Sequence, residues 1–488
     1  MQLNFLTAHK LKKMLEKREV CASDIAASIQ ESCEKLQPKI NAYINFDKSI
    51  LQKQAEEIEC YIAAGGKLHD FTAIPVAVKD NICTHGIKTT CASKILADYV
   101  PVYDATVIKK LQEHKYVLAG KANMDEFAMG SSNENSAFGP VKNPLDLQMV
   151  PGGSSGGPAA AVCAGMAICA LGSDTGGSIR QPASLCGIVG LKPTYGLVSR
   201  YGLISFASSL DQVGPITRDV TDSANLLSAI SGWDQCDSTS INTGKVSYKD
   251  FLVDDIKGLN IGVPKQLMAE GVDSQVADSV NNALEMAQHL GANIEQISLP
   301  SLEYALSVFY VIAPSEASSN LSKFDGVRYG YRNMQASTLH QMYRQTRAQG
   351  FGPEVKRRIM IGTYCLSSGY YDAYYEKAQR VRTLIINDFK KAFEKYDVLI
   401  SPTSPTTAFK IGEKTGDPLS MYLSDICTIP VNLAGLPAIS IPCGLSSENL
   451  PIGLQIIAGT LREDLIFKTA YSLEKAIGFN KFPLHLYE

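Results

Sequence analysis

The sequence predicts an α/β fold built around one large β-sheet, and two observations lead to this prediction. Short apolar runs that are typical of buried strands alternate with amphipathic stretches such as 107–114 and 274–290. This alternation of strand and helix is characteristic of α/β proteins. Similar strands also recur along the whole chain, at 74–78, 117–120, 259–263, 292–299, 398–400, 437–442 and 452–457. We therefore expect a single domain over residues 1–488.

The first 64 residues are predicted to form a helical N-terminal arm packed on this domain. Apolar residues recur at helical spacing in 7–17 and 23–36, with Thr7 and Ser23 as candidate N-caps. A strand is expected at 40–46 and a further helix at 50–64. Long helical stretches are also predicted at 303–330 and 352–395.

The composition excludes several classes of protein. The chain has 46 basic and 49 acidic residues, a net charge of −3, whereas nucleic-acid-binding domains usually carry a clear basic excess. The N-terminus lacks the apolar core of a secretory signal, and the longest apolar run, 159–171, is too short to span a bilayer. The twelve cysteines form no C-x-x-C pair. We expect a cytoplasmic protein with reduced cysteines and no bound metal.

Two serine clusters, each bracketed by glycines, are the best candidates for a functional site. They are Gly152–Gly157 (GGSSGG) and Thr175–Ser178 (TGGS), and they flank a predicted helix and strand. A flexible linker would lack such apolar flanks, and a phosphate-binding loop would need a Lys-Ser or Lys-Thr pair that is absent here. The remaining interpretation is a serine nucleophile beside backbone N–H groups that stabilise an oxyanion.

Two hydrolase mechanisms are compatible with these serines. The glycine spacing around Ser154 and Ser155 matches the G-x-S-x-G elbow, which requires a later acid and histidine. The histidines that follow, His289, His340 and His485, are predicted in helices or near the C-terminus rather than in a suitable loop. The alternative uses Lys79, which ends the predicted strand at 74–78. If burial lowers its pKa, neutral Lys79 is a usable base, with one serine relaying a proton from the other.

Three separate motifs resemble the amidase-signature family of serine hydrolases: VAVKDN, GGSSGGPAAAV and DTGGSIRQPA. The resemblance implies a large mixed β-sheet flanked by helices on both faces. It also implies that Lys79 is the base, Ser154 the bridging residue and Ser178 the nucleophile. The N–H groups of Thr175, Gly176, Gly177 and Ser178 then form the oxyanion hole, and Ser155 is a loop residue.

Further stretches, at 315–332, 352–382 and 432–444, resemble the A subunits of tRNA-dependent amidotransferases. This resemblance implies hydrolysis of glutamine and transfer of ammonia to a B subunit, which amidates Glu-tRNA(Gln) or Asp-tRNA(Asn), with a small C subunit wrapping both. No cofactor is expected on this chain, and ATP and magnesium are expected at the B subunit. Charged tRNA is expected to bind mainly through that partner.

The same resemblance assigns three residues to the glutamine substrate. Arg358 matches the family residue that holds the carboxylate, Asp425 matches the one that holds the amine, and Tyr310 is expected to line the pocket. The chain departs from the family at Phe309, where tandem tyrosines are usual, and at Pro158, which follows GGSSGG. Proline is well tolerated at the first position of a helix, so we expect Pro158 to have little effect.

Three alternatives remain open on the sequence alone. A stand-alone amidase shares the core motifs. An inactive scaffold protein is opposed by the intact Lys79, Ser154 and Ser178. Direct binding of tRNA by this chain is opposed by its near-neutral charge.

Overall fold

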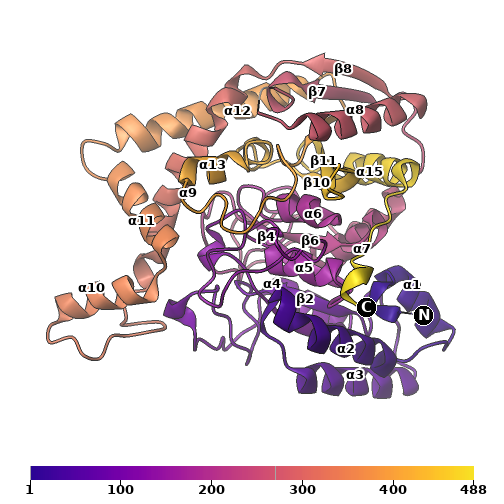
Figure 1. Cartoon of the computed structure of the whole chain (residues 1–488), viewed down its shortest axis with the longest axis horizontal. Coiled ribbons are helices and arrows are strands. Elements are labelled where there is room, and N and C mark those ends of the chain that lie inside the picture. The colour runs from indigo at the N-terminus through magenta and orange to yellow at the C-terminus, as the bar shows by residue number, and fades with distance from the viewer. Residues whose placement is uncertain (1, 270, 488) are drawn as a thin grey trace.

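A computed structural model describes residues 2–269 and 271–487 of the chain. Its eleven strands form one mixed sheet in the order β1-β3-β2-β4-β6-β5-β10-β11-β9-β7-β8. The strands are β1 (Tyr43–Asn45), β2 (Pro75–Lys79), β3 (Val117–Ala122), β4 (Cys169–Asp174), β5 (Val189–Lys192), β6 (Gln212–Thr217), β7 (Asn260–Pro264), β8 (Asn293–Ile297), β9 (Val398–Pro402), β10 (Ala438–Leu445) and β11 (Pro451–Ala458). Strands from both ends of the chain therefore share one sheet, as predicted (Figure 1).

Helices cover both faces of this sheet (Figure 1). The α-helices are α1 (Ala8–Glu16), α2 (Ala22–Ile40), α3 (Lys48–Ala63), α4 (Thr106–Glu113), α5 (Gly156–Cys163), α6 (Arg180–Cys186), α7 (Val220–Ile230), α8 (Ser274–His289), α9 (Ala305–Asn320), α10 (Leu339–Gly350), α11 (Pro353–Cys365), α12 (Lys377–Ala392), α13 (Pro418–Leu423), α14 (Ile429–Leu433) and α15 (Glu463–Ile477).

The strand sequences explain why both faces are covered. Successive side chains of a strand point to opposite faces. In β9, Val398 and Ile400 join the core that also contains residues of α8 and α15, whereas Leu399 joins a second core with residues of α9 and α12. A strand that is buried on both faces reads as a continuous apolar run, which is the pattern that predicted these strands.

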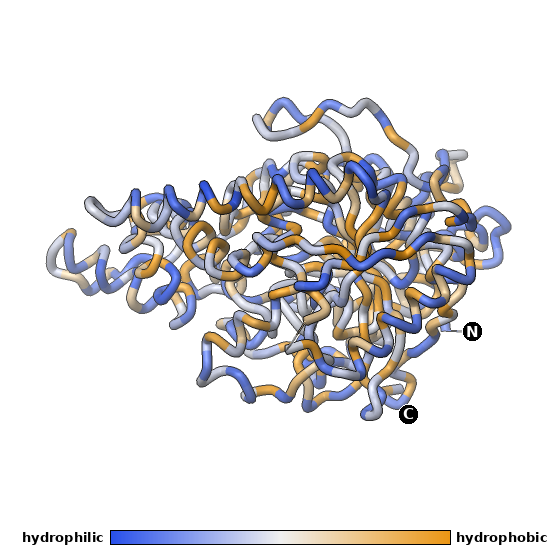
Figure 2. Tube along the Cα trace, turned by 90° about the horizontal axis from the view of Figure 1, so that it is seen from above, coloured by the Kyte–Doolittle hydropathy of each residue, from blue (hydrophilic) through white to orange (hydrophobic). Residues whose placement is uncertain are grey.

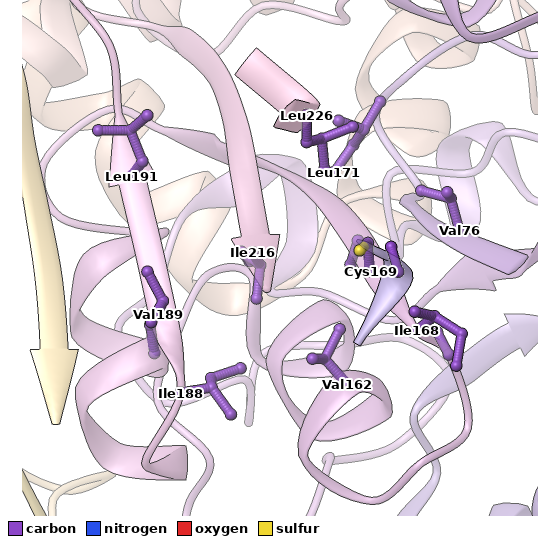
Figure 3. Close-up of a cluster of buried hydrophobic side chains, with 14 of the residues drawn as sticks. Val76, Val162, Ile168, Cys169, Leu171, Ile188, Val189, Leu191, Ile216 and Leu226 are labelled. Carbon is purple, nitrogen blue, oxygen red and sulfur yellow. The ribbon is translucent and has the colours of Figure 1, made fainter. Parts of the chain in front are cut away.

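The centre of the sheet carries the two serine clusters. Between β2, β4, β6 and α5 the core consists of small and branched apolar side chains, among them Val76, Val162, Leu171 and Ile216 (Figure 3). Figure 2 shows the hydrophobic residues gathered along the strands in the middle of the molecule. The first serine cluster ends in the first two residues of α5, and the second follows β4. The two clusters meet at the carboxyl end of the central strand β4, where the Ser155 N–H donates to the Ser178 carbonyl oxygen.

The N-terminal helices lie where they were predicted, but their caps differ. The N-cap of α2 is Cys21, completed by the Asp24 side chain, so the prediction of Ser23 was wrong. Thr7 does precede α1, although its side chain makes no capping hydrogen bond. Instead the Asp222 carboxylate accepts from the N–H groups of Ala8 and His9. A cap supplied from so far along the chain leaves no local sequence signal.

Other differences concern element boundaries. Residues Ile40 to Ala42 belong to the end of α2 or follow it, so the strand expected at 40–46 is only β1. The helical stretch at 352–395 is interrupted after Cys365 and resumes through a short π-helix, η8 (Asp372–Glu376). Pro158 is the third residue of α5 rather than the first. It still lies in the first turn, where the missing N–H would have no helical partner.

Candidate active site

Lys79 ends β2 and is completely buried against the first serine cluster. Its Nζ lies 2.8 Å from Ser154 Oγ, 2.8 Å from Ser155 Oγ and 3.1 Å from the Ser173 carbonyl oxygen. Burial lowers the pKa of Lys79 from 10.5 to about 7, although the carboxylates of Asp125, Asp174 and Asp211 oppose this shift. The amine is therefore neutral in a large fraction of molecules at neutral pH.

Ser155 makes contacts that the sequence interpretation missed. It was expected to be a loop residue, yet its Oγ contacts Lys79 as closely as Ser154 does, and it lies 3.1 Å from the Ser173 carbonyl oxygen. Its backbone N–H also donates to the Ser178 carbonyl at 3.1 Å. Ser155 therefore links the two serine clusters.

The loop that carries the first cluster is held in place by a buried carboxylate. Asp125 Oδ2 accepts from the N–H of Asn133 at 2.9 Å, and a side chain at Gly153 would collide with this carboxylate. The Gly153 N–H donates to Gln181 Oε1 at 3.0 Å. Only glycine allows the loop to approach so closely.

The second cluster forms a turn between β4 and α6. Asp174 accepts from the N–H groups of Gly177 (2.8 Å) and Ile179 (3.2 Å). Burial alone would raise the pKa of Asp174, but the Arg180 guanidinium, 3.0 Å away, lowers it to about 2. Asp174 is therefore a fixed anion that organises the turn. Thr428 Oγ1 supports it further by donating to the Gly176 carbonyl at 2.7 Å.

The backbone N–H groups of this turn fall into two kinds. The Gly177 N–H is occupied by Asp174. Those of Thr175, Gly176 and Ser178 donate to no acceptor in residues 2–269 and 271–487. The Ser178 side chain is almost fully buried beside them. Three donors are thus available next to Ser178.

Arg358 lies on α11 in an aromatic cage. Its guanidinium carbon is 5.3 Å from the ring centre of Tyr310, 5.4 Å from that of Tyr422 and 5.6 Å from that of Phe206. Arg358 Nε donates to Glu354 Oε1 at 2.7 Å. No described residue accepts from its two terminal nitrogens, which are the paired donors that suit a carboxylate.

Tyr310 connects this cage to the second serine cluster. Its ring stacks on Tyr422 with the centroids 3.8 Å apart, and it meets the neighbouring Phe309 ring edge-on at 5.2 Å. The Phe309 ring in turn lies against Gly176, where a Cβ atom would be 2.7 Å from the ring. Phenylalanine suits this position because the ring packs against backbone.

Asp425 follows α13 and is buried close to the same cage. One carboxylate oxygen accepts from the Ser131 hydroxyl, and the other is buried with no partner among the described residues. Burial raises the pKa of Asp425 to about 7, against the opposing influence of Ser131 and Arg358. An orphaned buried oxygen of this kind is a natural acceptor for a ligand.

The predicted site residues are therefore gathered in one region. Sequence analysis predicted Lys79, both serine clusters, Arg358, Asp425 and Tyr310 for the site. It did not predict the residues that contact them, which are Asp125, Ser131, Phe206, Glu354 and Tyr422. Buried polar and aromatic residues of this kind have no spacing that distinguishes them from ordinary core residues. His289, His340 and His485 make no hydrogen bond with Ser154 or Ser155 in the part of the chain that the structure describes, which argues against the histidine-dependent alternative.

A protein-family model matches a part of the chain that includes all of these site residues. The amidase family model matches residues 24–467. The chain belongs to the amidase family. This amidase is 56% identical over 475 residues to the A subunit of a glutamyl-tRNA(Gln) amidotransferase from Desulforamulus reducens, covering 97% of this chain and 98% of that protein. The protein of the same name from Caldanaerobacter subterraneus is 57% identical over 483 residues, with 99% of both chains covered.

A solved structure that is similar to this chain carries the same name as these sequence relatives. This amidase resembles the crystal structure of the A subunit of glutamyl-tRNA(Gln) amidotransferase from Thermotoga maritima, with a TM-score of 0.82 and 45% identity over 99% of this chain and 97% of the other. The amidase-signature fold implied by the three motifs is therefore confirmed.

Three side chains that could ligate a metal lie together near the N-terminal ends of α1 and α7. Among the described residues, one set of three potential ligands comes together, His9, Asp219 and Asp222. These carboxylates already cap α1 and α7, since Asp222 accepts from the start of α1 and Asp219 accepts from the Asp222 N–H at 2.8 Å. The twelve cysteines are unpaired. None of the helices described is long and apolar enough to cross a membrane.

Proposed function

We propose that this amidase is the glutamine-hydrolysing subunit of a tRNA-dependent amidotransferase. It releases ammonia for a partner B subunit that converts Glu-tRNA(Gln) to Gln-tRNA(Gln) with ATP and magnesium. The same complex is proposed to convert Asp-tRNA(Asn) to Asn-tRNA(Asn). A small C subunit completes the complex, which works in the cytoplasm. Full-length relatives at 56–57% identity favour this function over that of a stand-alone amide hydrolase.

The observation that carries the proposal is a pair of opposite charges beside the serine turn. Glutamine carries an α-carboxylate and an α-ammonium group. The terminal nitrogens of Arg358 suit the carboxylate, and the unpartnered oxygen of Asp425 suits the ammonium group. An amidase for simple amides needs neither charge.

The hydrogen-bond pattern supports Ser154 as the residue that passes its proton to Lys79. A neutral amine has two N–H bonds and one lone pair. Because Ser155 donates to the Ser173 carbonyl, it must accept from Lys79, and the second N–H is directed to the same carbonyl. The lone pair then faces the Ser154 hydroxyl at 2.8 Å.

In the proposed reaction, Ser178 Oγ attacks the side-chain carbonyl carbon of glutamine. Its proton passes to Ser154, and the proton of Ser154 passes to Lys79. The C–N bond breaks as this proton returns to the amide nitrogen, which leaves as ammonia, and a glutamyl ester remains on Ser178. Water then attacks the ester, the relay takes a proton from it and returns one to Ser178, and glutamate is released.

The oxyanion in this proposal is bound by the N–H groups of Thr175, Gly176 and Ser178. The N–H of Gly177, which the family resemblance also assigned to the oxyanion hole, instead holds the turn through Asp174. One such donor contributes about 100- to 1000-fold to kcat in serine hydrolases.

Substrate analogues test the proposal directly. Ammonia release is measured with glutamine, with glutaramate, which lacks the α-amino group, and with 4-aminobutanamide, which lacks the α-carboxylate. We expect glutamine to be hydrolysed with the highest kcat/KM. The Asp425→Asn variant should lose the preference over glutaramate, and Arg358→Met should lose the preference over 4-aminobutanamide. A wild-type chain that hydrolyses all three equally would contradict glutamine as the substrate.

A further inference from the structure

One peptide bond of the turn that follows β4 lies between two of the proposed oxyanion donors. It joins Gly176 to Gly177, and the N–H groups of Gly176 and Ser178 on either side of it donate to no described residue. Both of its residues are glycines, and Gly177 has a φ of +135°, which other residues rarely adopt. The dihedral angles beside this peptide determine the angle between the two N–H groups. The turn therefore presents both donors to one oxyanion only if the peptide is held still.

This peptide is held at both of its ends. Asp174 Oδ1 accepts from the Gly177 N–H at 2.8 Å, and Thr428 Oγ1 donates to the Gly176 carbonyl oxygen at 2.7 Å. No other donor in residues 2–269 and 271–487 reaches this carbonyl oxygen. Thr428 and Asp174 are completely buried, so bulk water does not compete for either bond. Removing the hydroxyl would leave the carbonyl oxygen buried without a partner.

The proton of the Thr428 hydroxyl belongs to the bond with Gly176. A hydroxyl has one proton to donate, and a second acceptor, the Asp425 carbonyl oxygen, lies 3.1 Å from Thr428 Oγ1. That oxygen already accepts from the N–H groups of Thr428 and Ile429, each at 3.0 Å. The Gly176 carbonyl oxygen is closer and has no other donor among the described residues. The proton is therefore directed to Gly176.

Thr428 is carried by a rigid part of the molecule. It is the N-cap of α14, whose five residues are all buried. Asn432 of this helix donates from Nδ2 to Asp174 Oδ1 at 2.8 Å, so α14 also supports the carboxylate that holds the other end of the peptide. A Cβ atom at Gly177 would lie 2.1 Å from Thr428 Oγ1. Glycine at this position therefore lets the turn approach the threonine closely enough for the hydrogen bond.

We infer that Thr428 is a positioning residue for the oxyanion hole, which holds the Gly176–Gly177 peptide so that the N–H groups of Gly176 and Ser178 meet the same oxyanion. This inference rests on the proposed function, which assigns these N–H groups to the oxyanion. Thr428 acts through the backbone of the turn. The oxyanion exists only in the tetrahedral intermediate and in the transition states beside it. The hydroxyl therefore contributes to kcat and not to the binding of glutamine.

Variants of two buried threonines in the full-length chain test the role of the hydroxyl. Thr428→Val and Thr428→Ala remove the donor, and Thr428→Ser keeps it. Thr217→Val is the matched control, since the buried Thr217 hydroxyl also donates to a backbone carbonyl, that of Asp219 at 2.8 Å. Thr217 lies at the end of β6 opposite to Gln212, the residue that pairs with Asp174.

Steady-state ammonia release from glutamine gives the first readout. We expect Thr428→Val and Thr428→Ala to lower kcat by about 10- to 100-fold, less than the loss of a donor itself, with KM within about twofold of wild type. Thr428→Ser should recover most of this kcat, and Thr217→Val should have the kcat of wild type. Urea denaturation is measured alongside, and the two valine variants should lose similar stability because each loses one buried hydrogen bond.

A boronic acid analogue of glutamine, with boron in place of the side-chain carbonyl carbon, gives the second readout. When Ser178 Oγ bonds to boron, its proton passes to the relay and a tetrahedral anion remains in the turn. We expect the Ki of this analogue to increase in Thr428→Val by about the factor by which kcat falls, because both depend on the bound anion. The Ki of glutamate, which places no tetrahedral anion in the turn, should not change. A general disturbance of the site would change both Ki values.

Three results would overturn the inference. They are a kcat for Thr428→Val and Thr428→Ala equal to that of Thr217→Val, a fall in kcat with an unchanged Ki for the boronic acid, and a Thr428→Ser variant as slow as Thr428→Val. Failure of the proposed function has a different outcome, in which wild type hydrolyses a simple amide but releases no ammonia from glutamine. The kcat on that amide would then test Thr428 in the same variants, so the two failures are distinguishable.

Discussion

The protonation state of Lys79 sets the pH at which the proposed relay works. Burial lowers the pKa of this amine to about 7, and the relay requires the neutral form. We therefore expect kcat for glutamine hydrolysis to rise between about pH 6 and pH 8 and then to level off. The measurement is a pH profile of kcat at saturating glutamine. A kcat that falls over this range would exclude Lys79 as the base.

Asp425 should affect substrate binding over the same pH range. Burial raises its pKa to about 7, so below this pH the empty site holds a neutral acid that attracts an ammonium group poorly. We expect the KM for glutamine to increase as the pH falls from about 8 to 6. The Asp425→Asn variant should have a higher KM that no longer depends on pH. If the KM of wild type is equally flat, Asp425 does not bind the ammonium group.

In the proposed relay, Ser155 positions Lys79 and is not the nucleophile. It accepts a hydrogen bond from Lys79 and so leaves the lone pair of the amine directed to Ser154. Ser155→Ala should lower kcat by about tenfold or less, the usual effect of one hydrogen bond. Steady-state kinetics of ammonia release provides the measurement. Complete loss of activity in Ser155→Ala, with Ser178→Ala still active, would mean that the relay is misassigned.

At the scale of single elements, the packing of α11 on α9 controls the position of Arg358. A Cβ atom at Gly362 would collide with the Pro314 carbonyl, so Gly362→Ala must move the helix. We expect a loss of about 1–3 kcal/mol in the free energy of unfolding and a higher KM for glutamine, with kcat less affected. Gly416→Ala is the matched control, because a side chain there meets no atom within 4 Å. Chemical denaturation and substrate titration measure the two effects. Equal KM values in the two variants would show that this packing does not position Arg358.

The elements differed in how well the sequence predicted them. Strands β2, β9 and β11 consist mostly of apolar residues, and their prediction succeeded because both of their faces are buried. Strand β6 was missed because Gly214 and Pro215 interrupt its apolar pattern. Helix α10 was predicted only as a polar helix around His340, without bounds, because it buries little apolar surface and so lacks a clear apolar stripe.

At the scale of the whole molecule, the two serine clusters and Lys79 were predictable as parts of one site because glycine-bracketed serines and a lysine at the end of an apolar strand are unusual sequence patterns. Residues such as Glu354 and Tyr422 were not, since they act through contacts between segments that are far apart in the sequence. Glu354 pairs with Arg358 and accepts from the Tyr422 hydroxyl at 3.1 Å. Such contacts become visible only when α11 and α13 are placed in space.

The most direct test of the account is ammonia release from glutamine by wild type and Ser178→Ala, each alone and with the B and C subunits and charged tRNA. We predict activity that depends on Ser178 and increases when the partner proteins and charged tRNA are added. Ammonia release that survives in Ser178→Ala would contradict the assigned nucleophile. Equal activity on simple amides, unchanged by the partners, would contradict the amidotransferase function.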